Sequence, residues 1–245
     1  MQKLQVLADI LNRLNLTLFC KNPNVSSVNI NVLCKQCQHY DSEMKGYHHG
    51  NLKKELIRCA CKMCERDGYT KLSIRSLAKE SNVSQTAPYR HFKTKEDLYA
   101  AIAKEGFEKL NKEMSSIKTR NSKNYLISCG KAYISFGLKN ANTYDLMFGT
   151  AVGSYVDYPD LSASANKLFQ ILLSSFKKLS DDADEIVAFK CITLWSMVHG
   201  LVGIIRKVNI AGDGNSNGAM PFASQISKNL DFHLDKVITG LIETS

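Results

Sequence analysis

Apolar residues recur every three or four positions through most of the chain, the spacing that places them on one face of an α-helix. No stretch of the sequence shows the sustained alternation of apolar and polar residues that is typical of a β-strand. The pattern therefore predicts an all-α protein. In chain order, the expected helices span residues 51–67, 74–80, 84–91, 94–114, 122–139, 141–149, 161–179, 183–208 and 222–242.

Three of these helices have recognisable start signals. Ser73 and Ser84 each precede a short helical stretch, and a serine at that position accepts a hydrogen bond from a free backbone amide. Thr94 is followed three residues later by Asp97, a spacing like that of a capping box. We therefore expect two short helices joined by a tight connection at residues 81–83, followed by a longer helix.

The composition is that of an ordinary folded protein. The 245 residues are 44% hydrophobic and 22% charged, which argues against disorder, collagen or a membrane bundle. The formal net charge is +9, and residues 45–115 hold 15 Lys and Arg against nine Asp and Glu. A charge excess concentrated in one segment favours a polyanionic partner such as nucleic acid.

The sequence also bears on the cellular compartment. No run of 18 uninterrupted apolar residues predicts a transmembrane helix. Polar residues such as Asp9 and Arg13 interrupt the apolar stretch near the N-terminus, unlike the core of a signal peptide. We therefore expect a cytoplasmic protein that does not associate with membranes, with its eight cysteines reduced.

The two short helices and the longer helix that follows them form a helix-turn-helix candidate. In this motif the second helix presents short or polar side chains to base edges at its first turn, while flanking groups bind phosphates. Residues 73–95, SIRSLAKESNVSQTAPYRHFKTK, meet both requirements.

Four motifs resemble the N-terminal domain of the tetracycline-repressor (TetR/AcrR) family of bacterial transcription regulators. They are GYHHGNL at residues 46–52, LSIRSLA at 72–78, VSQTAPYRHF at 83–92 and KEDL at 95–98. In the second half, YDLMF at 144–148 and WSMVHG at 195–200 resemble the regulatory domain of the Trp-His-Gly subgroup. The resemblance implies a helix-turn-helix domain at residues 44–113, with three helices, and a helical-bundle domain for ligand binding and dimerisation at residues 114–245.

The resemblance also implies a DNA interface. Gln85 and Thr86 would meet bases or phosphates, Tyr89 and His91 would bind phosphates, and Lys95 would bind another phosphate together with the amides of its helix. Asn82 replaces the usual turn glycine but tolerates a positive φ. Pro88 removes a backbone donor and should shorten the second helix. The complete set of expected DNA contacts is Lys45, Tyr47, His48, Arg75, Ser84, Gln85, Thr86, Tyr89, His91 and Lys95.

In the second half, the resemblance implies a cavity for a small effector. Trp195 and His199 are four residues apart and so share a helical face. Mixed apolar walls with few polar groups suit a hydrophobic or aromatic ligand. The alternative is that these side chains only fill a core. The expected ligand-binding residues are Tyr133, Phe136, Tyr144, Met147, Phe148, Trp195 and His199.

The family further implies a homodimer formed by the last two long helices. Two recognition helices must enter successive major grooves, so a pair of subunits has a physical purpose. The candidate interface residues are Ile186, Phe189, Ile192, Thr193, Val202 and Ile205, with Leu230, Leu234, Val237 and Leu241.

These observations predict a ligand-responsive repressor that binds a palindromic operator and is released by a small molecule. No glycine-rich phosphate loop or nucleophile–base motif is recognisable, so we expect neither an enzyme nor a cofactor. The alternative is an adaptor of the same fold that binds DNA and regulates a protein partner without a small-molecule effector.

The cysteines suggest little chemistry of their own. Cys59 and Cys64 are expected to pack into the core, whereas Cys61 points more outward and is an alternative redox sensor. Cys34, Cys37 and His39 have the spacing of half a zinc site, but no second half is apparent, so no metal site is predicted. Residues 1–43 precede the family-like chain, and we expect either an upstream extension from a mis-assigned start or an added dimerisation or interaction helix.

Overall fold

A computed structural model describes residues 52–211 and 220–243. Within these ranges the chain forms nine α-helices and short 3-10 turns, with no strand, which confirms the all-α prediction. Lys45, Tyr47, His48, the Cys34–Cys37 pair and the 1–43 extension lie outside the described residues. The α-helices are α2 (Leu52–Asp67), α3 (Ile74–Glu80), α4 (Lys95–Ser115), α5 (Ser122–Lys139), α6 (Ala141–Phe148), α7 (Pro159–Phe176), α8 (Asp184–Ala211), α9 (Met220–Lys228) and α10 (Leu230–Glu243).

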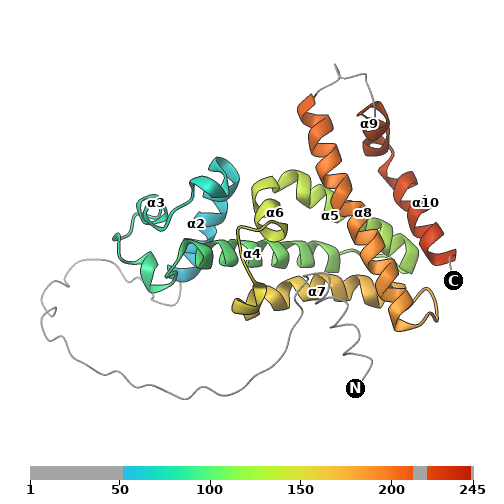
Figure 1. The fold of residues 1–245 in the computed structure, drawn as a ribbon, viewed down its shortest axis with the longest axis horizontal. Coiled ribbons are helices and arrows are strands. Elements are labelled where there is room, and N and C mark those ends of the chain that lie inside the picture. The colour runs from blue at the N-terminus through green and yellow to red at the C-terminus, as the bar shows by residue number, and fades with distance from the viewer. Residues whose placement is uncertain (1–51, 212–219, 244–245) are drawn as a thin grey trace, which may run out of the picture.

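A small head at one end contains α2, α3 and the start of α4 (Figure 1). The buried residues of α2 are Leu56, Ala60, Met63 and Cys64, one stripe at helical spacing. Ser73 caps α3 as predicted: its hydroxyl accepts from the Ser76 amide at 3.0 Å. Gly68, with a φ of 83°, closes α2 and permits the turn into η1 (Tyr69–Lys71).

Helix α4 connects the head to the larger helical body (Figure 1). Its start is the predicted capping box, in which the Asp97 amide donates to the Thr94 hydroxyl at 3.1 Å and Asp97 accepts from the Thr94 amide. Buried side chains run along its whole length, from Leu98 to Met114. Because one continuous helix belongs to both parts, a displacement at one end is transmitted to the other.

In the body, α5, α6 and α7 pack on α4, whereas α8 packs on α5, α7 and α9, and α10 packs mainly on α5 (Figure 1). Helices α5 and α8 approach so closely at Gly137 that an added Cβ would meet Val202 at 2.7 Å. Lys190 on α8 is buried, and its ammonium pairs with Asp182 at 2.7 Å. A buried charge without a partner would be costly, so this pair fixes how the chain enters α8.

Two of the helices expected in the body differ from the structure. The single helix predicted over 222–242 is wrong, because Asn229 interrupts it: the Asn229 amide side chain donates to the Gln225 carbonyl at 3.1 Å and separates α9 from α10. The helix predicted over 161–179 begins earlier and ends earlier, since Pro159 occupies its first turn, where a missing N–H is tolerated.

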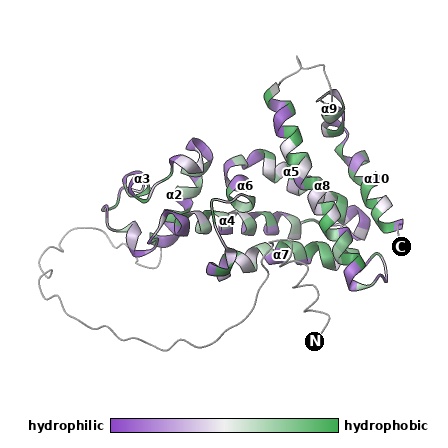
Figure 2. Cartoon of the chain, in the orientation of Figure 1, coloured by the Kyte–Doolittle hydropathy of each residue, from purple (hydrophilic) through white to green (hydrophobic). Residues whose placement is uncertain are grey.

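Hydrophilic residues are concentrated on the head, while hydrophobic residues dominate α7 and α8 (Figure 2). By length and composition alone, residues Asp184–Ile210 are apolar enough to cross a membrane. This segment packs on α5, α7 and α9, and 44% of its most apolar 18-residue stretch is buried inside the protein.

Candidate nucleic-acid interface and ligand pocket

The connection between α3 and α4 presents polar side chains to solvent. Ser84, Gln85 and Thr86 are exposed, and the Ser84 and Thr86 hydroxyl oxygens lie 3.3 Å apart. The turn before them passes through Asn82, whose φ of 52° confirms the expected tolerance of this asparagine for the left-handed region. The polar residues are therefore held at the outer end of a tight turn.

The helix predicted over residues 84–91, with Ser84 as its cap, is wrong. The Ala87 amide donates to the Ser84 carbonyl at 3.0 Å, which makes a turn, and only η2 (Pro88–Arg90) follows as a single 3-10 turn. Pro88 has no N–H with which to continue an α-helical ladder, so the shortening expected from this proline goes further than predicted.

Two aromatic residues of this segment have opposite surroundings. Phe92 is 1% exposed and anchors the turn in the core of the head, as expected. Tyr89 is 44% exposed and its hydroxyl is available to a partner. His91 is half-buried, with its ring edge-on to Phe92 at a centroid distance of 6.4 Å.

Basic side chains without acidic partners surround the turn. Lys71, Arg75, Arg90 and Lys93 are exposed, and in the described part of the chain none of them forms an ion pair. By contrast, Arg66 pairs with both Asp67 and Glu80 at 2.7 Å. Arg75 was expected here, while Arg90 and Lys93 were not. Arg90 has no acidic residue three or four positions away, which was the available signal, whereas Lys93 has Glu96 and Asp97 at these spacings and gave no such signal.

Lys95, an expected phosphate ligand, is exposed but partly engaged. Its ammonium donates to the Thr70 carbonyl at 3.0 Å and lies 5.2 Å from the centre of the Tyr99 ring. The Asp97 carboxylate accepts from the amides of Lys93 and Thr94 at 2.8 and 3.0 Å. The backbone amides of Lys93 and Thr94 therefore already have an acceptor within the protein.

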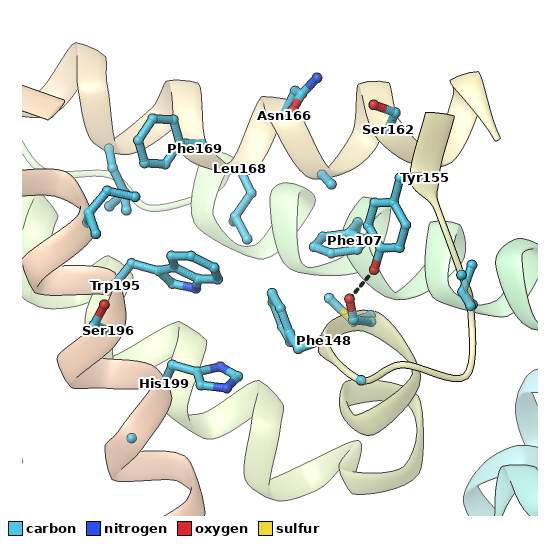
Figure 3. A pocket seen from close by; sticks show the side chains of 18 residues that line it. Phe107, Phe148, Tyr155, Ser162, Asn166, Leu168, Phe169, Trp195, Ser196 and His199 are labelled. Carbon is cyan, nitrogen blue, oxygen red and sulfur yellow. Dashed lines mark hydrogen bonds between the residues drawn. The ribbon is translucent and has the colours of Figure 1, made fainter. Parts of the chain in front are cut away.

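A cavity of about 510 Å³ lies in the body, between α4, α6, α7 and α8. Four of the expected ligand-binding residues form its wall, namely Met147, Phe148, Trp195 and His199. Figure 3 shows Phe148, Trp195 and His199 converging on the same space. A volume of this size is typical of sites for small organic molecules.

The rest of the wall was not predicted from the sequence. Helix α4 contributes Phe107, α7 contributes six residues, the α6–α7 connection contributes four, and α8 contributes three more besides Trp195 and His199. Only the aromatic character of some of them was visible in the sequence. The apolar side chains that were missed are Phe107, Val152, Tyr155, Ala165, Leu168, Phe169, Leu172 and Ile192.

The other three expected ligand-binding residues do not line the cavity. Tyr133 and Tyr144 are 2% and 4% exposed and lie behind His199, where they form part of the core. Phe136 is 1% exposed, with the Lys109 ammonium 5.8 Å from its ring centre. Because these three side chains are buried in the core, an effector in this cavity would touch His199 and its neighbours but not the three residues themselves.

A polar cluster connects these buried tyrosines to the cavity wall. The Tyr144 hydroxyl lies 2.6 Å from His199 Nδ1, and the Tyr133 hydroxyl lies 3.1 Å from the same nitrogen. The indole N–H of Trp195 donates to the Tyr133 hydroxyl at 3.1 Å. Burial lowers the pKa of His199 and raises that of Tyr144 to about 12, so all members are uncharged at neutral pH.

The α6–α7 connection joins the cavity to the start of α4. Its Gly153 lines the cavity, and the Gly153 amide donates to the Glu96 carboxylate at 2.7 Å. Farther along, the Tyr158 hydroxyl donates to the Asp97 carboxylate at 3.3 Å. Tyr155, which also lines the cavity, donates its hydroxyl proton to the Met147 carbonyl (Figure 3). We name residues 149–158 the strap.

A second contact ties the head to α6. The Glu65 carboxylate of α2 accepts from the Thr143 amide at 2.8 Å, and the Glu65 carbonyl accepts from the Asn142 side chain at 3.2 Å. A carboxylate at a helix start is favourable because free amides and the positive end of the helix dipole meet there. The other end of α6 carries Met147 and Phe148, so this short helix spans from the head to the cavity.

The cysteines of α2 are packed rather than reactive. Cys64 is fully buried, as expected, and Cys59 packs partly buried against the core. Cys61, expected to point outward, is half-buried against the core, and burial raises the pKa of its thiol to about 12. Such a thiol remains protonated at neutral pH, which disfavours the alternative of a redox sensor at this position.

Two family models match the chain. Residues 56–102 match the model described as bacterial regulatory proteins, tetR family. Residues 126–213 match the model described as tetracyclin repressor-like, C-terminal domain. The two matches cover the head and the body separately, on either side of the middle of α4 and the start of α5.

Individual proteins are similar at lower identity. An uncharacterized HTH-type transcriptional regulator of Bacillus subtilis, YobS, is 26% identical over 97 residues, 39% of this chain. The aligned region spans about half of that relative, 51% of its length. A solved TetR variant from Acinetobacter baumannii AYE in complex with minocycline is 17% identical, with a TM-score of 0.54 over 77% of this chain and 94% of that one. BioQ with its natural double-stranded DNA operator is 18% identical, with a TM-score of 0.51 over 78% and 97%. At these identities the structures show a shared fold.

Proposed function

The chain belongs to the tetracycline-repressor family of DNA-binding transcriptional regulators, and we propose that it is a repressor that binds a palindromic operator as a homodimer and is released by a small molecule. The observation that carries this proposal is the exposed turn at residues 84–93, polar at its tip and basic at its flanks. The proposal places the protein in the cytoplasm, where bacterial DNA is accessible.

In the proposed complex, the tip of the turn enters the major groove. Gln85 and Thr86 are short and exposed, and an amide side chain can pair with the edge of adenine through two hydrogen bonds. Tyr89 and His91 flank the tip and bind phosphates. Arg90 and Lys93, which are free of ion pairs among the described residues, add electrostatic attraction that does not depend on the base sequence.

Dimerisation through α8 and α10 would bring two heads to one operator. One face of α8 exposes Phe189, 69% exposed, together with Gly200 and Gly203, where an added Cβ would meet nothing within 4 Å. Phe232 on α10 is 65% exposed. Apolar and small residues on exposed faces of neighbouring helices suit a partner surface of the same kind. Three of the expected interface residues cannot contribute, because Val202, Ile205 and Leu234 are buried inside the subunit.

Release requires that the cavity influence the head. Phe107 of α4 lines the cavity, and the strap connects the cavity wall to Glu96 and Asp97 at the start of the same helix. We infer that an effector which packs against Met147, Phe148 and the strap shifts this helix start and therefore the DNA-binding turn. A complete switch from 1:99 to 99:1 needs a differential binding free energy of about 5.5 kcal/mol.

The alternative adaptor would need a filled core in place of a cavity. The cavity of about 510 Å³ beside Trp195 supports a regulator that responds to a small molecule. An adaptor would also use its exposed apolar residues for a protein partner, whereas here most of those described lie on α8 and α10, the helices proposed for self-association.

Selection of genomic DNA fragments by the purified protein tests the proposal. We expect enrichment of fragments that share an inverted repeat with half-site centres about one helical turn or a multiple of it apart. A screen of small molecules for release of these fragments follows, and Trp195→Ala should alter the response to a releasing compound more than it alters DNA affinity. Fragments without a shared motif, or equal losses of DNA affinity and response in Trp195→Ala, would contradict the proposal.

A further inference from the structure

The cavity wall holds one polar side chain whose protonation is dictated by buried neighbours. His199 lines the cavity, while its Nδ1 lies within 3.1 Å of two tyrosine hydroxyls behind the wall. The two nitrogens of an imidazole ring point in widely different directions, so Nε2 is directed away from the tyrosine pair. Within the described residues Nε2 has no hydrogen-bond partner, and the cavity is where one can be supplied.

A count of protons fixes the form of the imidazole. The indole of Trp195 and the hydroxyls of Tyr133 and Tyr144 each bring one proton to the cluster. The acceptors within reach are the two hydroxyl oxygens and His199 Nδ1. If Nδ1 accepts, every proton has an acceptor. If Nδ1 carries a proton, one buried tyrosine hydroxyl is left without an acceptor in the cluster, which is unfavourable.

The same cluster requires His199 to be neutral. A protonated imidazole carries a proton on Nδ1 and so creates the same unsatisfied hydroxyl, and burial disfavours its charge as well. The remaining form is neutral with the proton on Nε2. The wall therefore presents the Nε2–H of His199 as a fixed donor beside the rings of Trp195 and Phe148 (Figure 3).

The rest of the wall defines the charge of the ligand. None of the described residues that line the cavity is Lys, Arg, Asp or Glu. An ion in this cavity would lose its water without gaining a counter-ion, which is costly. The polar groups besides His199 are few: Ser162, Asn166, Ser196 and the strap backbone lie on the wall.

Resting on the proposed function, we propose that the effector is an uncharged aromatic carbonyl compound whose oxygen accepts a hydrogen bond from His199 Nε2–H while its ring packs against the cavity side of Trp195 and Phe148. The tyrosine pair selects this ligand from behind the wall by fixing which nitrogen holds the proton.

The first test reads the protonation of His199 without ligand or DNA. The protein is labelled with ¹⁵N-histidine, and the resonances of His199 are identified among the six histidines by their loss in His199→Gln. At neutral pH we expect a protonated Nε2 and an unprotonated Nδ1. A proton on Nδ1, or on both nitrogens, would overturn the proposal.

The second test uses matched probes on the full chain. Trp195 is the single tryptophan, so the protein has one indole N–H resonance, and that indole lies on the cavity wall. We expect 2-acetylnaphthalene to shift this resonance with an affinity about tenfold tighter than 2-isopropenylnaphthalene, which has the same shape but no acceptor oxygen, and 2-naphthoate to bind more weakly than the ketone.

The matched variant is His199→Phe, which retains an aromatic ring but has no donor. In this variant the ketone and the alkene should bind within about twofold of each other. Equal affinities for the two probes in the unmodified protein, a preference for naphthoate, or no binding of the ketone would each overturn the proposal. Operator binding enters neither test, so a failure to bind DNA would contradict the proposed function while these results remain interpretable on their own.

Discussion

Tyr89 and Phe92 lie three residues apart, yet one side chain is 44% exposed and the other 1%. The burial of Phe92 was predictable because it closes the motif with an apolar ring. In the proposed function the exposure of Tyr89 matters, since an exposed phenol on a basic surface can donate a hydrogen bond to a phosphate. Removing the two side chains should therefore have different consequences.

Tyr89→Phe should weaken operator binding about tenfold to a hundredfold, the cost of one hydrogen bond to a charged group, without lowering the unfolding temperature. Phe92→Ala should lower the free energy of unfolding by about 3–5 kcal/mol, because it leaves a cavity in the head. Fluorescence anisotropy and thermal unfolding measure the two effects. A loss of stability in Tyr89→Phe would mean that the hydroxyl is structural.

Lys95→Ala should reduce the slope of log affinity against log salt by about one, as expected for one lost phosphate contact. The control is Lys104→Ala on the same helix, because Lys104 is paired with Glu108 at 2.7 Å and lies toward the body. DNA titrations at several salt concentrations give both slopes. An unchanged slope in Lys95→Ala would mean that Lys95 binds no phosphate and only donates its hydrogen bond to the Thr70 carbonyl.

Asn82 offers a test of backbone geometry alone. At a φ of 52°, Asn82→Ala should lower the free energy of unfolding by about 1 kcal/mol, because a Cβ without a polar group is disfavoured there. Asn82→Gly should be within about 0.5 kcal/mol of the original protein, since glycine accepts this φ freely. Urea denaturation compares the three proteins. Equal losses of stability in the two variants would mean that the asparagine side chain itself, and not its tolerance of a positive φ, stabilises the turn.

The helices that the sequence predicted well are those with strong local signals. The starts of α3 and α4 were predictable from Ser73 and Thr94, whose side chains cap them. Residues 84–91 were predicted as a helix that Pro88 would only shorten. Whether Pro88 prevents the helix altogether depends on how the turn is anchored in the core, and no local sequence pattern reveals that. The break at Asn229 was missed for a similar reason: asparagine also occurs inside helices, so its presence alone does not predict an interruption.

The cavity was only partly predictable for a different reason. Trp195 and His199 could be paired from their spacing on one helix, and both line the cavity. Phe107, Tyr155 and Leu168 come from three other segments, and only the folded arrangement brings them to the same wall. Aromatic character alone could not separate these residues from Tyr133 and Phe136, which fill the core.

The strap gives a specific expectation for effector response. Glu96→Ala removes the acceptor of the Gly153 amide and should raise the effector concentration needed for half-release by about fivefold, because one link between cavity and head is lost. DNA affinity without effector should change much less. Glu105→Ala, an exposed glutamate on the same helix, is the control. Equal changes in effector response and DNA affinity would indicate a structural role only.

Viewed as a whole, the molecule separates a polar head from an apolar body, with α4 running between them (Figures 1 and 2). The exposed apolar residues of α8 and α10 lie on the body. In the proposed dimer, these helices set the distance between two heads, and the cavities next to them control the angle of each α4. The affinity for an operator with two half-sites then depends on formation of the dimer.

Phe189→Glu should convert the dimer to a monomer, since it places a charge in the centre of the proposed apolar interface. Operator affinity should fall about a hundredfold or more, because a single head makes half of the contacts. Gln170→Glu, which adds the same charge to an exposed position on α7, should change neither property. Light scattering coupled to gel filtration gives the mass. A dimeric Phe189→Glu protein would place the interface elsewhere.

The ratio of two affinities tests the central claim most directly: the affinity of the purified protein for a selected inverted repeat divided by its affinity for a shuffled duplex of the same length, both at physiological salt. A protein that reads bases through Gln85 and Thr86 should give a ratio of about a thousand or more, and the ratio should fall steeply when both residues are changed to alanine. A ratio near one, or a large ratio that the double variant retains, would contradict the account.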